Sequence, residues 1–398
     1  MSTPAPDSTS TNSTSAESPT PTNAWTTRRL LAWMNEAFAG KGIDSPRVCA
    51  EMLLTHVTGQ QRLALYTAPD RPASDTELAA LRQLVSRALR HEPVQYLTNE
   101  AAFFGHRLFV DRRVLIPRPC TELLVEHAVQ HITRAAMNAQ GHVVGGLGES
   151  LARQAELAPS ETPAGASIDD EDLSEEERTK REIARNRSEL LKARAGRSQR
   201  GRGVLIADVC TGSGCMAIAL AKALPGAHVI ATDISPDALQ VASENAQRLG
   251  VSECITFIEG SLLEPVVDAL QSLQDPARAS AAGFSRPPTG FDVIVSNPPY
   301  IPDHEWTGGL VDDNVKLHEP TLALRGGTDG LAFVVPILQD APALLKPAGL
   351  LLIEIAACTA NAVADAARQH TLLESTTANV VRDLEGFERM LKATRRGS

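Results

Sequence analysis

Four consecutive residues of this 398-residue chain carry the clearest chemical signal: Asn297, Pro298, Pro299 and Tyr300. They follow the apolar run 291–295, and neither proline can donate a hydrogen bond to a sheet, so the chain must leave the strand here. The Asn297 side-chain oxygen and the Pro298 carbonyl can accept hydrogen bonds from a planar NH2 group, and Tyr300 can pack against that group. Such acceptors aim a delocalised nitrogen lone pair at an electrophilic carbon without a full negative charge. The motif therefore predicts group transfer to an amide or exocyclic amine nitrogen.

A second signal is the glycine-rich turn at 208–214, where an apolar strand pattern gives way to a helical one. Glycines let a ligand approach the backbone closely, and the start of a helix offers free N–H groups. The spacing is not that of a dinucleotide fingerprint and no Walker lysine follows, so dinucleotides and P-loop phosphates are disfavoured. A plain tight turn remains an alternative. The candidate cofactor residues here are Cys210, Thr211, Gly212, Ser213 and Gly214.

Asp233 strengthens the case for a cofactor. It ends the second predicted strand, about twenty residues after the glycines, where a carboxylate can accept both ribose hydroxyls of an adenosine. The alternative is that Asp233 caps the helix after Pro236, although Ser235 already suits that role. Together, the turn and Asp233 predict an adenosine cofactor site.

These residues require a sheet that places strand ends side by side. Apolar runs alternate with helical patterns from residue 204 onward, which predicts an α/β domain with a doubly wound, mostly parallel, Rossmann-like sheet at 204–398. The strands are expected at 204–209, 228–232, 255–258, 291–295 and 350–355, and the helices at 215–224, 236–249 and 330–345.

The rest of the chain divides by composition. Residues 1–24 form a Ser/Thr/Pro-rich tail that we expect to be disordered. Residues 25–90 read as a small helical domain, with apolar residues at helical spacing. Residues 91–135 read as a proline-punctuated linker with a short hairpin near 107–110. Residues 136–203 read as a charged, disordered insertion, and 272–290 as a shorter one. The helical spacing at 25–90 is carried by Leu30, Leu31, Met34, Phe38, Met52, Leu53 and Val57.

The basic run 178–202 leaves two interpretations open: a contact with nucleic acid or a ribosome, and a solvated insert, which charge runs more often are. The formal net charge is −10, from 48 acidic and 38 basic residues, and this balance argues against a protein that coats nucleic acid. Six scattered cysteines without CxxC spacing predict reduced thiols and no metal site. Without an apolar span or a signal core, we expect a cytoplasmic protein with no membrane contact.

The strand-linked Asn-Pro-Pro-Tyr motif, the glycine turn and Asp233 resemble N-methyltransferases of planar NH2 groups. Further stretches resemble one branch of these, the release factor glutamine methyltransferases (the HemK/PrmC-like N5-glutamine methyltransferase family). The resemblance covers residues 25–130 and 203–395 and is highly specific. The stretches are 91–97 (HEPVQYL), 103–105 (FFG), 114–122 (VLIPRPCTE), 318–331 (HEPTLALRGGTDGL) and 382–387 (RDLEGF).

The resemblance implies a class I methyltransferase fold and S-adenosyl-L-methionine as cofactor, held by 210–214 and Asp233. It implies that Asn297 touches both cofactor and substrate, that Pro298, Pro299 and Tyr300 line a glutamine pocket, and that the helical domain recognises the substrate. Pro117 and Arg118 are expected to border the same pocket, or to act as an interdomain strut. The implied substrate is the glutamine of the Gly-Gly-Gln motif in peptide chain release factors.

Three positions depart from the family pattern. Cys210 replaces the first glycine of the turn, a feature of the sister enzymes that methylate ribosomal protein L3. Ser261 replaces an acidic residue near the adenine, where Leu262 is expected to make contact instead. Asn99 replaces a glycine. The L3 enzyme, a DNA adenine-N6 methyltransferase and a non-catalytic ribosome-associated binder remain alternatives; no target-recognition domain is evident, so stable DNA binding is not expected.

Overall fold

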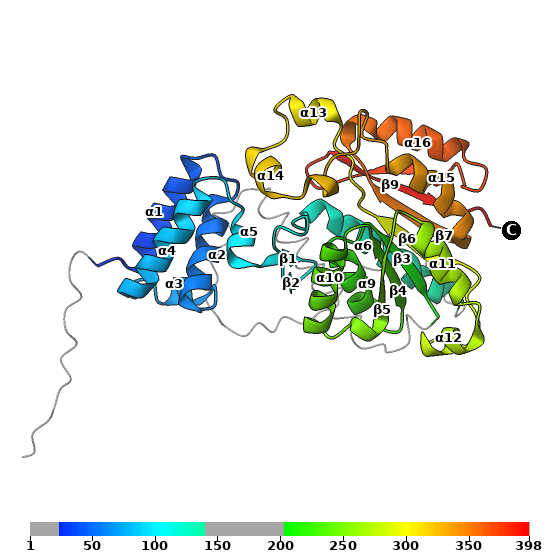
Figure 1. Ribbon diagram of the computed structural model, residues 1–398, viewed down its shortest axis with the longest axis horizontal. Coiled ribbons are helices and arrows are strands. Elements are labelled where there is room, and N and C mark those ends of the chain that lie inside the picture. The colour runs from blue at the N-terminus through cyan, green and yellow to red at the C-terminus, as the bar shows by residue number, and fades with distance from the viewer. Residues whose placement is uncertain (1–23, 140–202, 398) are drawn as a thin grey trace, which may run out of the picture. The chain divides into compact units, whose positions relative to one another are not determined.

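The computed structural model describes residues 24–139 and 203–397, and its chain divides into two compact units between Thr98 and Asn99 (Figure 1). Nearly all of the predicted tail and most of the predicted insertion lie outside the described residues. Where the insertion was expected to begin, a helix continues to Ala139.

The described residues of the first unit form helices, as the apolar spacing predicted, and one isolated β-bridge joins Thr26 to Pro72. Its core is built from the predicted residues Leu30, Met34, Phe38 and Leu53, all buried, while Leu31, Met52 and Val57 are partly buried against it. Ser74 begins the longest helix with a capping box, in which its side chain and that of Glu77 each accept a backbone N–H of the other residue. The helices are α1 (Thr27–Ala39), α2 (Pro46–Thr58), α3 (Ala64–Thr67), α4 (Asp75–Ala88) and α5 (Val94–Thr98).

The second unit contains a seven-stranded sheet in the order β5-β4-β3-β6-β7-β9-β8. Five neighbouring strands are parallel, and β9 and β8 add an antiparallel edge. This confirms the predicted doubly wound, mostly parallel sheet. The strands are β3 (Leu205–Val209), β4 (His228–Asp233), β5 (Ile255–Glu259), β6 (Phe291–Ser296), β7 (Leu345–Glu354), β8 (Asn379–Arg382) and β9 (Glu388–Thr394).

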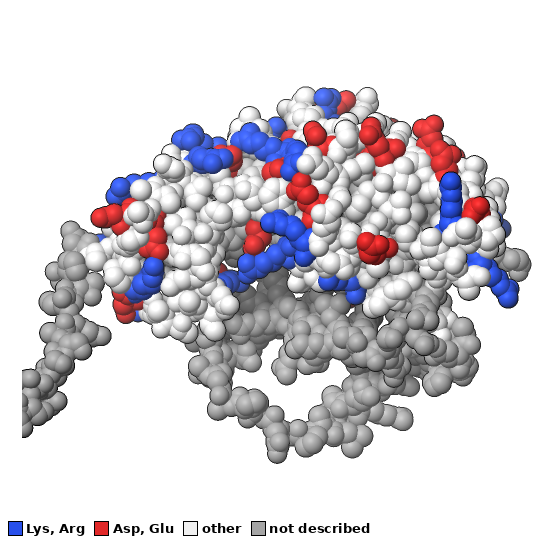
Figure 2. Space-filling model, turned by 60° about the horizontal axis from the view of Figure 1, so that its bottom comes forward, with Lys and Arg blue, Asp and Glu red and all other residues white. Residues whose placement is uncertain are grey.

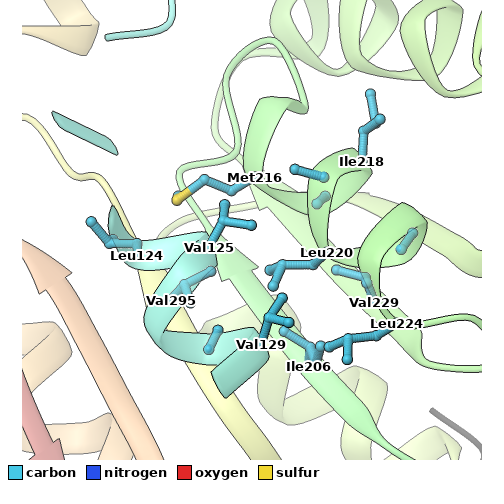
Figure 3. Packing of buried hydrophobic residues seen from close by; sticks show 14 of the residues in the cluster. Leu124, Val125, Val129, Ile206, Met216, Ile218, Leu220, Leu224, Val229 and Val295 are labelled. Atoms are coloured by element: carbon cyan, nitrogen blue, oxygen red, sulfur yellow. The ribbon is translucent and has the colours of Figure 1, made fainter. Parts of the chain in front are cut away.

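Helices cover both faces of the sheet because alternate strand residues point to opposite sides. On one face, Val125 and Val129 of α6 lie among Leu220 of α9 and Ile206 of β3 (Figure 3). Helix α10 packs on this face too, while α11, α12, α15 and α16 pack on the other. These helices are α6 (Glu122–Ala139), α9 (Cys215–Ala223), α10 (Pro236–Arg248), α11 (Glu264–Ser272), α12 (Pro276–Ala281), α15 (Val334–Leu344) and α16 (Ala360–Gln369).

The remaining elements lie in connections, several of them at the carboxyl ends of the strands. A hairpin precedes the sheet, and two short helices and a 3-10 turn follow β6. The elements are β1 (Ala101–Phe103), β2 (His106–Leu108), α13 (Asp303–Thr307), α14 (Asp313–His318), and the 3-10 turns Pro119–Thr121, Ser252–Cys254, Thr321–Ala323 and Ala357–Thr359.

The segment 272–290, predicted to be a second, shorter insertion, contains α12 and buries Phe284. Three predictions of local structure need correction. The hairpin turns at Phe104-Gly105, so β2 ends at Leu108 rather than continuing to 110. Helix α15 starts at Val334 because the glycine-rich stretch before it makes turns. Strands β8 and β9 were not predicted.

Surface charge is mixed in the described part of the chain. Basic and acidic side chains both occur across the face in Figure 2. No helix among the described residues is both long and apolar enough to cross a membrane. All six cysteines are described and all are free thiols.

Candidate active site

The Asn-Pro-Pro-Tyr segment 297–300, which we call the elbow, and the glycine turn 208–214 leave the sheet side by side. Strands β3 and β6 are parallel neighbours with Val209 opposite Ser296, and the Ser296 hydroxyl donates to the Val209 carbonyl over 2.8 Å. Cys210 and Asn297 are therefore the first residues beyond adjacent strand ends. The order of the strands reverses between β3 and β6, which is where open α/β sheets bind ligands.

One pocket collects most of the predicted site residues. Those that line it are Pro117, Cys210, Thr211, Gly212, Ser213, Asp233, Leu262, Asn297 and Pro299. The other four are not among its lining residues: Gly214 is the N-cap of α9, Pro298 is buried, and the Tyr300 and Arg118 side chains donate to buried carboxylates.

Asp233 holds the glycine turn by its carboxylate. Its Oδ2 accepts the Gly212 N–H at 2.9 Å and its Oδ1 accepts the Ser235 N–H at 3.0 Å. Burial raises the pKa of Asp233, and these backbone hydrogen bonds oppose the rise. Each oxygen keeps a lone pair for a further donor. Ser235, as expected, caps α10 by accepting the Ala238 N–H.

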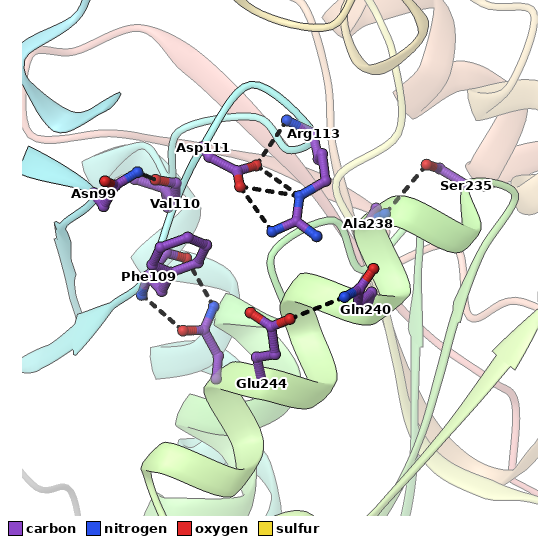
Figure 4. Close-up of polar contacts among 10 residues, drawn as sticks. Asn99, Phe109, Val110, Asp111, Arg113, Ser235, Ala238, Gln240 and Glu244 are labelled. Carbon is purple, nitrogen blue, oxygen red and sulfur yellow. Dashed lines mark hydrogen bonds and ion pairs between the residues drawn. The ribbon is translucent and has the colours of Figure 1, made fainter. Parts of the chain in front are cut away.

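Three residues of the turn, Cys210, Gly212 and Gly214, have a positive φ, a conformation that favours glycine. Gly214 has a φ of 79°, and a Cβ there would lie 3.0 Å from the Ala242 Cβ, so this glycine lets α9 and α10 approach. Cys210, at a position where we expected glycine, has the left-handed conformation with a φ of 62°. Asn99, at the other such position, has a φ of 53° and donates its side-chain amide to the Val110 carbonyl at 3.2 Å (Figure 4).

Asp208 lies under the turn and is fully buried. Its Oδ2 accepts the Thr211 hydroxyl at 2.6 Å and the Ala217 N–H at 3.0 Å, while Oδ1 has no hydrogen-bond partner among the described residues. Burial raises the pKa of this carboxyl to about 7, against the pull of the two hydrogen bonds.

The segment after β5 supplies an apolar wall. Leu262 has a φ of 48°, and its carbonyl accepts the Thr232 hydroxyl at 3.4 Å. Leu262, the half-exposed Ile234 and Ser261 all line the pocket. The apolar side chains of this wall can pack against a planar ring, whereas the Ser261 side chain offers only a hydroxyl.

The Pro117-Arg118 segment is tied to the other side of the pocket by Glu319. The Glu319 carboxylate is buried and accepts the Ile116 N–H at 3.0 Å and the Arg118 guanidinium at 2.5 Å. Its neighbour Pro320 lines the pocket together with Pro117. Glu319 therefore joins two pocket walls that are far apart in sequence.

Comparisons with known proteins agree with this architecture. The model for the PrmC N-terminal domain matches residues 29–98, and a methyltransferase domain model matches residues 201–386. A release factor glutamine methyltransferase of Chlorobaculum tepidum is 37% identical over 83% of this chain and 85% of its own length. The enzymes of the same name from Geobacter sulfurreducens (83% and 84%) and Rhodopirellula baltica (92% and 95%) are 32% and 31% identical. This chain belongs to the release factor glutamine methyltransferase family.

Members of this family are protein-(glutamine-N5) methyltransferases that use S-adenosylmethionine, and the pocket fits that cofactor. Asp233 has free lone pairs for hydroxyl donors, and the wall at Leu262 is apolar. A Cβ at Gly212 would meet no atom within 4 Å, so this glycine leaves open space at the pocket wall. Within the described ranges, no group of three or more His, Cys, Asp or Glu side chains is arranged to hold a metal ion.

Sequence reasoning gave no role to a buried network behind the elbow. Glu354, at the end of β7, is fully buried; its Oε2 accepts the Thr121 hydroxyl at 2.7 Å and its Oε1 accepts the Tyr300 hydroxyl at 2.9 Å. Thr121 in turn accepts the Asn297 side-chain N–H at 3.1 Å. Burial raises the pKa of Glu354, and the hydrogen bonds from Thr121 and Tyr300 oppose the rise.

Asn245 of α10 is a second residue that sequence reasoning missed. Its Oδ1 accepts the Phe109 N–H at 2.7 Å, and its Nδ2 donates to the Phe109 carbonyl at 2.9 Å and the Ser213 carbonyl at 3.0 Å. It thus joins the segment after the hairpin to the glycine turn. The available signal was a polar residue among the apolar positions Val241, Ala242 and Ala246 of one helix face.

Proposed function

We propose that this enzyme methylates the N5 amide nitrogen of the glutamine in the Gly-Gly-Gln motif of peptide chain release factors. The relatives that carry the release factor name support this substrate, since the chain spans most of their length. The single observation that carries the chemistry is the register of β3 against β6, which puts Asn297 beside the cofactor turn.

The catalytic role falls to the elbow. The bound cofactor supplies an electrophilic methyl carbon on a sulfonium sulfur. Asn297 Oδ1 and the Pro298 carbonyl accept the hydrogens of the glutamine NH2 group and direct its lone pair at that carbon. With the cofactor bound, an N–C bond would replace the C–S bond of the sulfonium, and the methylated nitrogen would then lose a proton to water. No general base is required, because the nitrogen becomes acidic only after transfer.

The binding roles divide along the pocket. We assign the ribose hydroxyls to Asp233, the backbone contacts with the cofactor to the 210–214 turn, and the adenine to Leu262. Pro117, Arg118 and Pro299 form the approach to the glutamine, with Tyr300 supporting the planar amide. The helical residues 25–90 recognise the release factor, 91–135 link them to the catalytic domain, and 204–398 carry the catalysis.

The decisive experiment measures the mass of a purified release factor after incubation with the enzyme and S-adenosylmethionine. We expect a gain of one methyl group, mapped by peptide fragmentation to the Gly-Gly-Gln glutamine. Asn297→Ala abolishes the gain, whereas Asn361→Ala, the same change at an exposed position of α16, leaves it unchanged.

Two further methyl acceptors, ribosomal protein L3 and duplex DNA, test the alternative substrates. Ribosomal protein L3 is included because Cys210 is a feature of the L3 enzymes, and duplex DNA because the motif also occurs in adenine enzymes. Methylation of L3 or DNA without methylation of the release factor would refute the proposal. A fully active Asn297→Ala enzyme would refute the role of that side chain.

A further inference from the structure

The buried carboxylate of Glu354 controls the polarity of the hydrogen bonds behind the elbow. All of its contacts are donors: the hydroxyls of Thr121 and Tyr300, and the Cys120 thiol at 3.7 Å. No Lys or Arg among the described residues forms an ion pair with it. The three hydrogen bonds, and the charge of Arg389 from beyond ion-pair distance, favour its ionised form against the rise in pKa that burial causes. A carboxylate taken out of water without a paired cation is expensive and is typical of functional sites rather than of packing.

The Thr121 hydroxyl has only one hydrogen, and Glu354 takes it. Toward Asn297, Thr121 can therefore only accept. The group of the Asn297 amide that faces it must be the NH2, as the 3.1 Å contact from Nδ2 requires. The oxygen Oδ1 is then the free end of the amide, since it accepts no hydrogen bond from the described residues.

An asparagine amide has nearly the same shape in its two orientations, so packing alone does not select one. With Nδ2 turned to the pocket, Asn297 would present a donor to a substrate that also presents donors. Hydrogen bonding must make the choice. Here Glu354, through the Thr121 hydroxyl, selects the orientation of the Asn297 amide, and both Glu354 and Thr121 are buried.

We propose that Glu354 and Thr121 are positioning residues that lock the Asn297 amide with its oxygen toward the acceptor nitrogen. The same carboxylate holds the Tyr300 hydroxyl, so one buried group anchors both ends of the Asn-Pro-Pro-Tyr elbow. The proposal rests on the proposed function, because it assigns Oδ1 to the substrate amide.

The test compares two changes at Thr121. Thr121→Val keeps the shape of the side chain and removes both its donor and its acceptor, while Thr121→Ser keeps the hydroxyl. We expect kcat for release factor methylation to fall about 100-fold in Thr121→Val, as for the loss of one preorganised hydrogen bond at a reacting centre. The KM for S-adenosylmethionine changes little, and Thr121→Ser recovers most of the rate. The control Thr133→Val alters another buried threonine, on α6, and retains activity.

A second readout does not depend on the substrate. In enzyme labelled with 15N-asparagine, the Asn297 NH2 signals are assigned by their loss in Asn297→Ala. Their exchange with water is expected to be slow in the wild type and in Thr121→Ser, and faster in Thr121→Val. If the wild type methylates no release factor, the proposed function fails, and this measurement still decides the inference.

Three results would overturn the inference. One is unchanged exchange of the Asn297 NH2 group in Thr121→Val. Another is a Thr121→Val enzyme with the wild-type kcat on a release factor that the wild type methylates. The third is an equal loss in Thr121→Ser and Thr121→Val, measured well below the thermal midpoint of both, because the hydroxyl would then have no special part.

Discussion

Gly330 packs directly against the backbone of Tyr300: a Cβ at Gly330 would lie 2.5 Å from the Tyr300 carbonyl oxygen. A Cβ at Gly326 would lie 2.7 Å from the Tyr300 Cα, and the Gly326 N–H donates to the Ile301 carbonyl at 2.8 Å. Because these contacts are between backbone atoms, no flexible side chain of Tyr300 could move aside to make room for a Cβ. The loop 326–330 therefore fixes the position of the elbow from behind.

Gly330→Ala should displace the elbow and reduce methyl transfer. We expect kcat to fall about 100-fold, because small misplacements of positioning groups have effects of that size. The matched control is Gly309→Ala. Gly309 has a φ of 80°, close to the 79° of Gly330, but a Cβ there would meet no atom within 4 Å. An equal loss of activity in both variants would show that strain of the backbone, and not the clash with Tyr300, reduces methyl transfer.

The adjacency of the glycine turn, Asp233 and Asn297 could be predicted because each follows a strand of a parallel sheet, whose carboxyl ends share one edge. The contacts of Glu319 with Arg118 and of Glu354 with Thr121 could not be predicted. The paired residues are 201 and 233 positions apart, and no local sequence pattern identifies such pairs. Strand β8 escaped prediction for a different reason. It is an edge strand without an alternation of buried and exposed residues.

Changing two glycines of the cofactor turn to alanine should affect the stability of the enzyme to different extents. Gly214→Ala drives a methyl group into Ala242, so we expect a loss of about 3 kcal/mol in the free energy of unfolding. Gly212→Ala meets open space and should lose only about 1 kcal/mol, from its positive φ.

Ligand binding separates the same two variants. The added methyl of Gly212→Ala occupies space at the pocket wall, so its affinity for S-adenosylhomocysteine should fall at least about tenfold, or 1.4 kcal/mol. Chemical denaturation and calorimetry measure the two effects. Normal binding by a well-folded Gly212→Ala enzyme would remove this turn from the cofactor site.

Asp233→Asn tests the ribose contact. Asparagine keeps one acceptor but loses the charge, so we expect the affinity for S-adenosylhomocysteine to fall about 10- to 100-fold, as for hydrogen bonds to a charged group. Asp237→Asn is the control, because it removes a negative charge from an exposed position at the start of α10, next to the same site. Equal losses in both would indicate a general effect of charge, and no loss in Asp233→Asn would contradict a ribose contact.

Asp208 should make the stability of the apo enzyme depend on pH in a direction opposite to that of most carboxylates. Its pKa is raised from 3.8 to about 7 by burial, so the folded state favours the protonated form. Its contribution to stability is therefore complete below about pH 4 and is lost as the pH rises through about 7. Over that window the loss is at most about 1.4 kcal/mol per pH unit.

The measurement is urea unfolding of the wild type and Asp208→Asn between pH 5 and pH 8.5. Asparagine can keep the acceptor for Thr211 and Ala217 and has no charge to bury. The stability of Asp208→Asn relative to the wild type should therefore rise from pH 5 to about pH 7 and level off above it. Asp340→Asn, at an exposed position of α15, should give a curve parallel to that of the wild type. A constant difference between Asp208→Asn and the wild type would mean that Asp208 stays ionised in the folded enzyme, held by its two hydrogen bonds despite its burial.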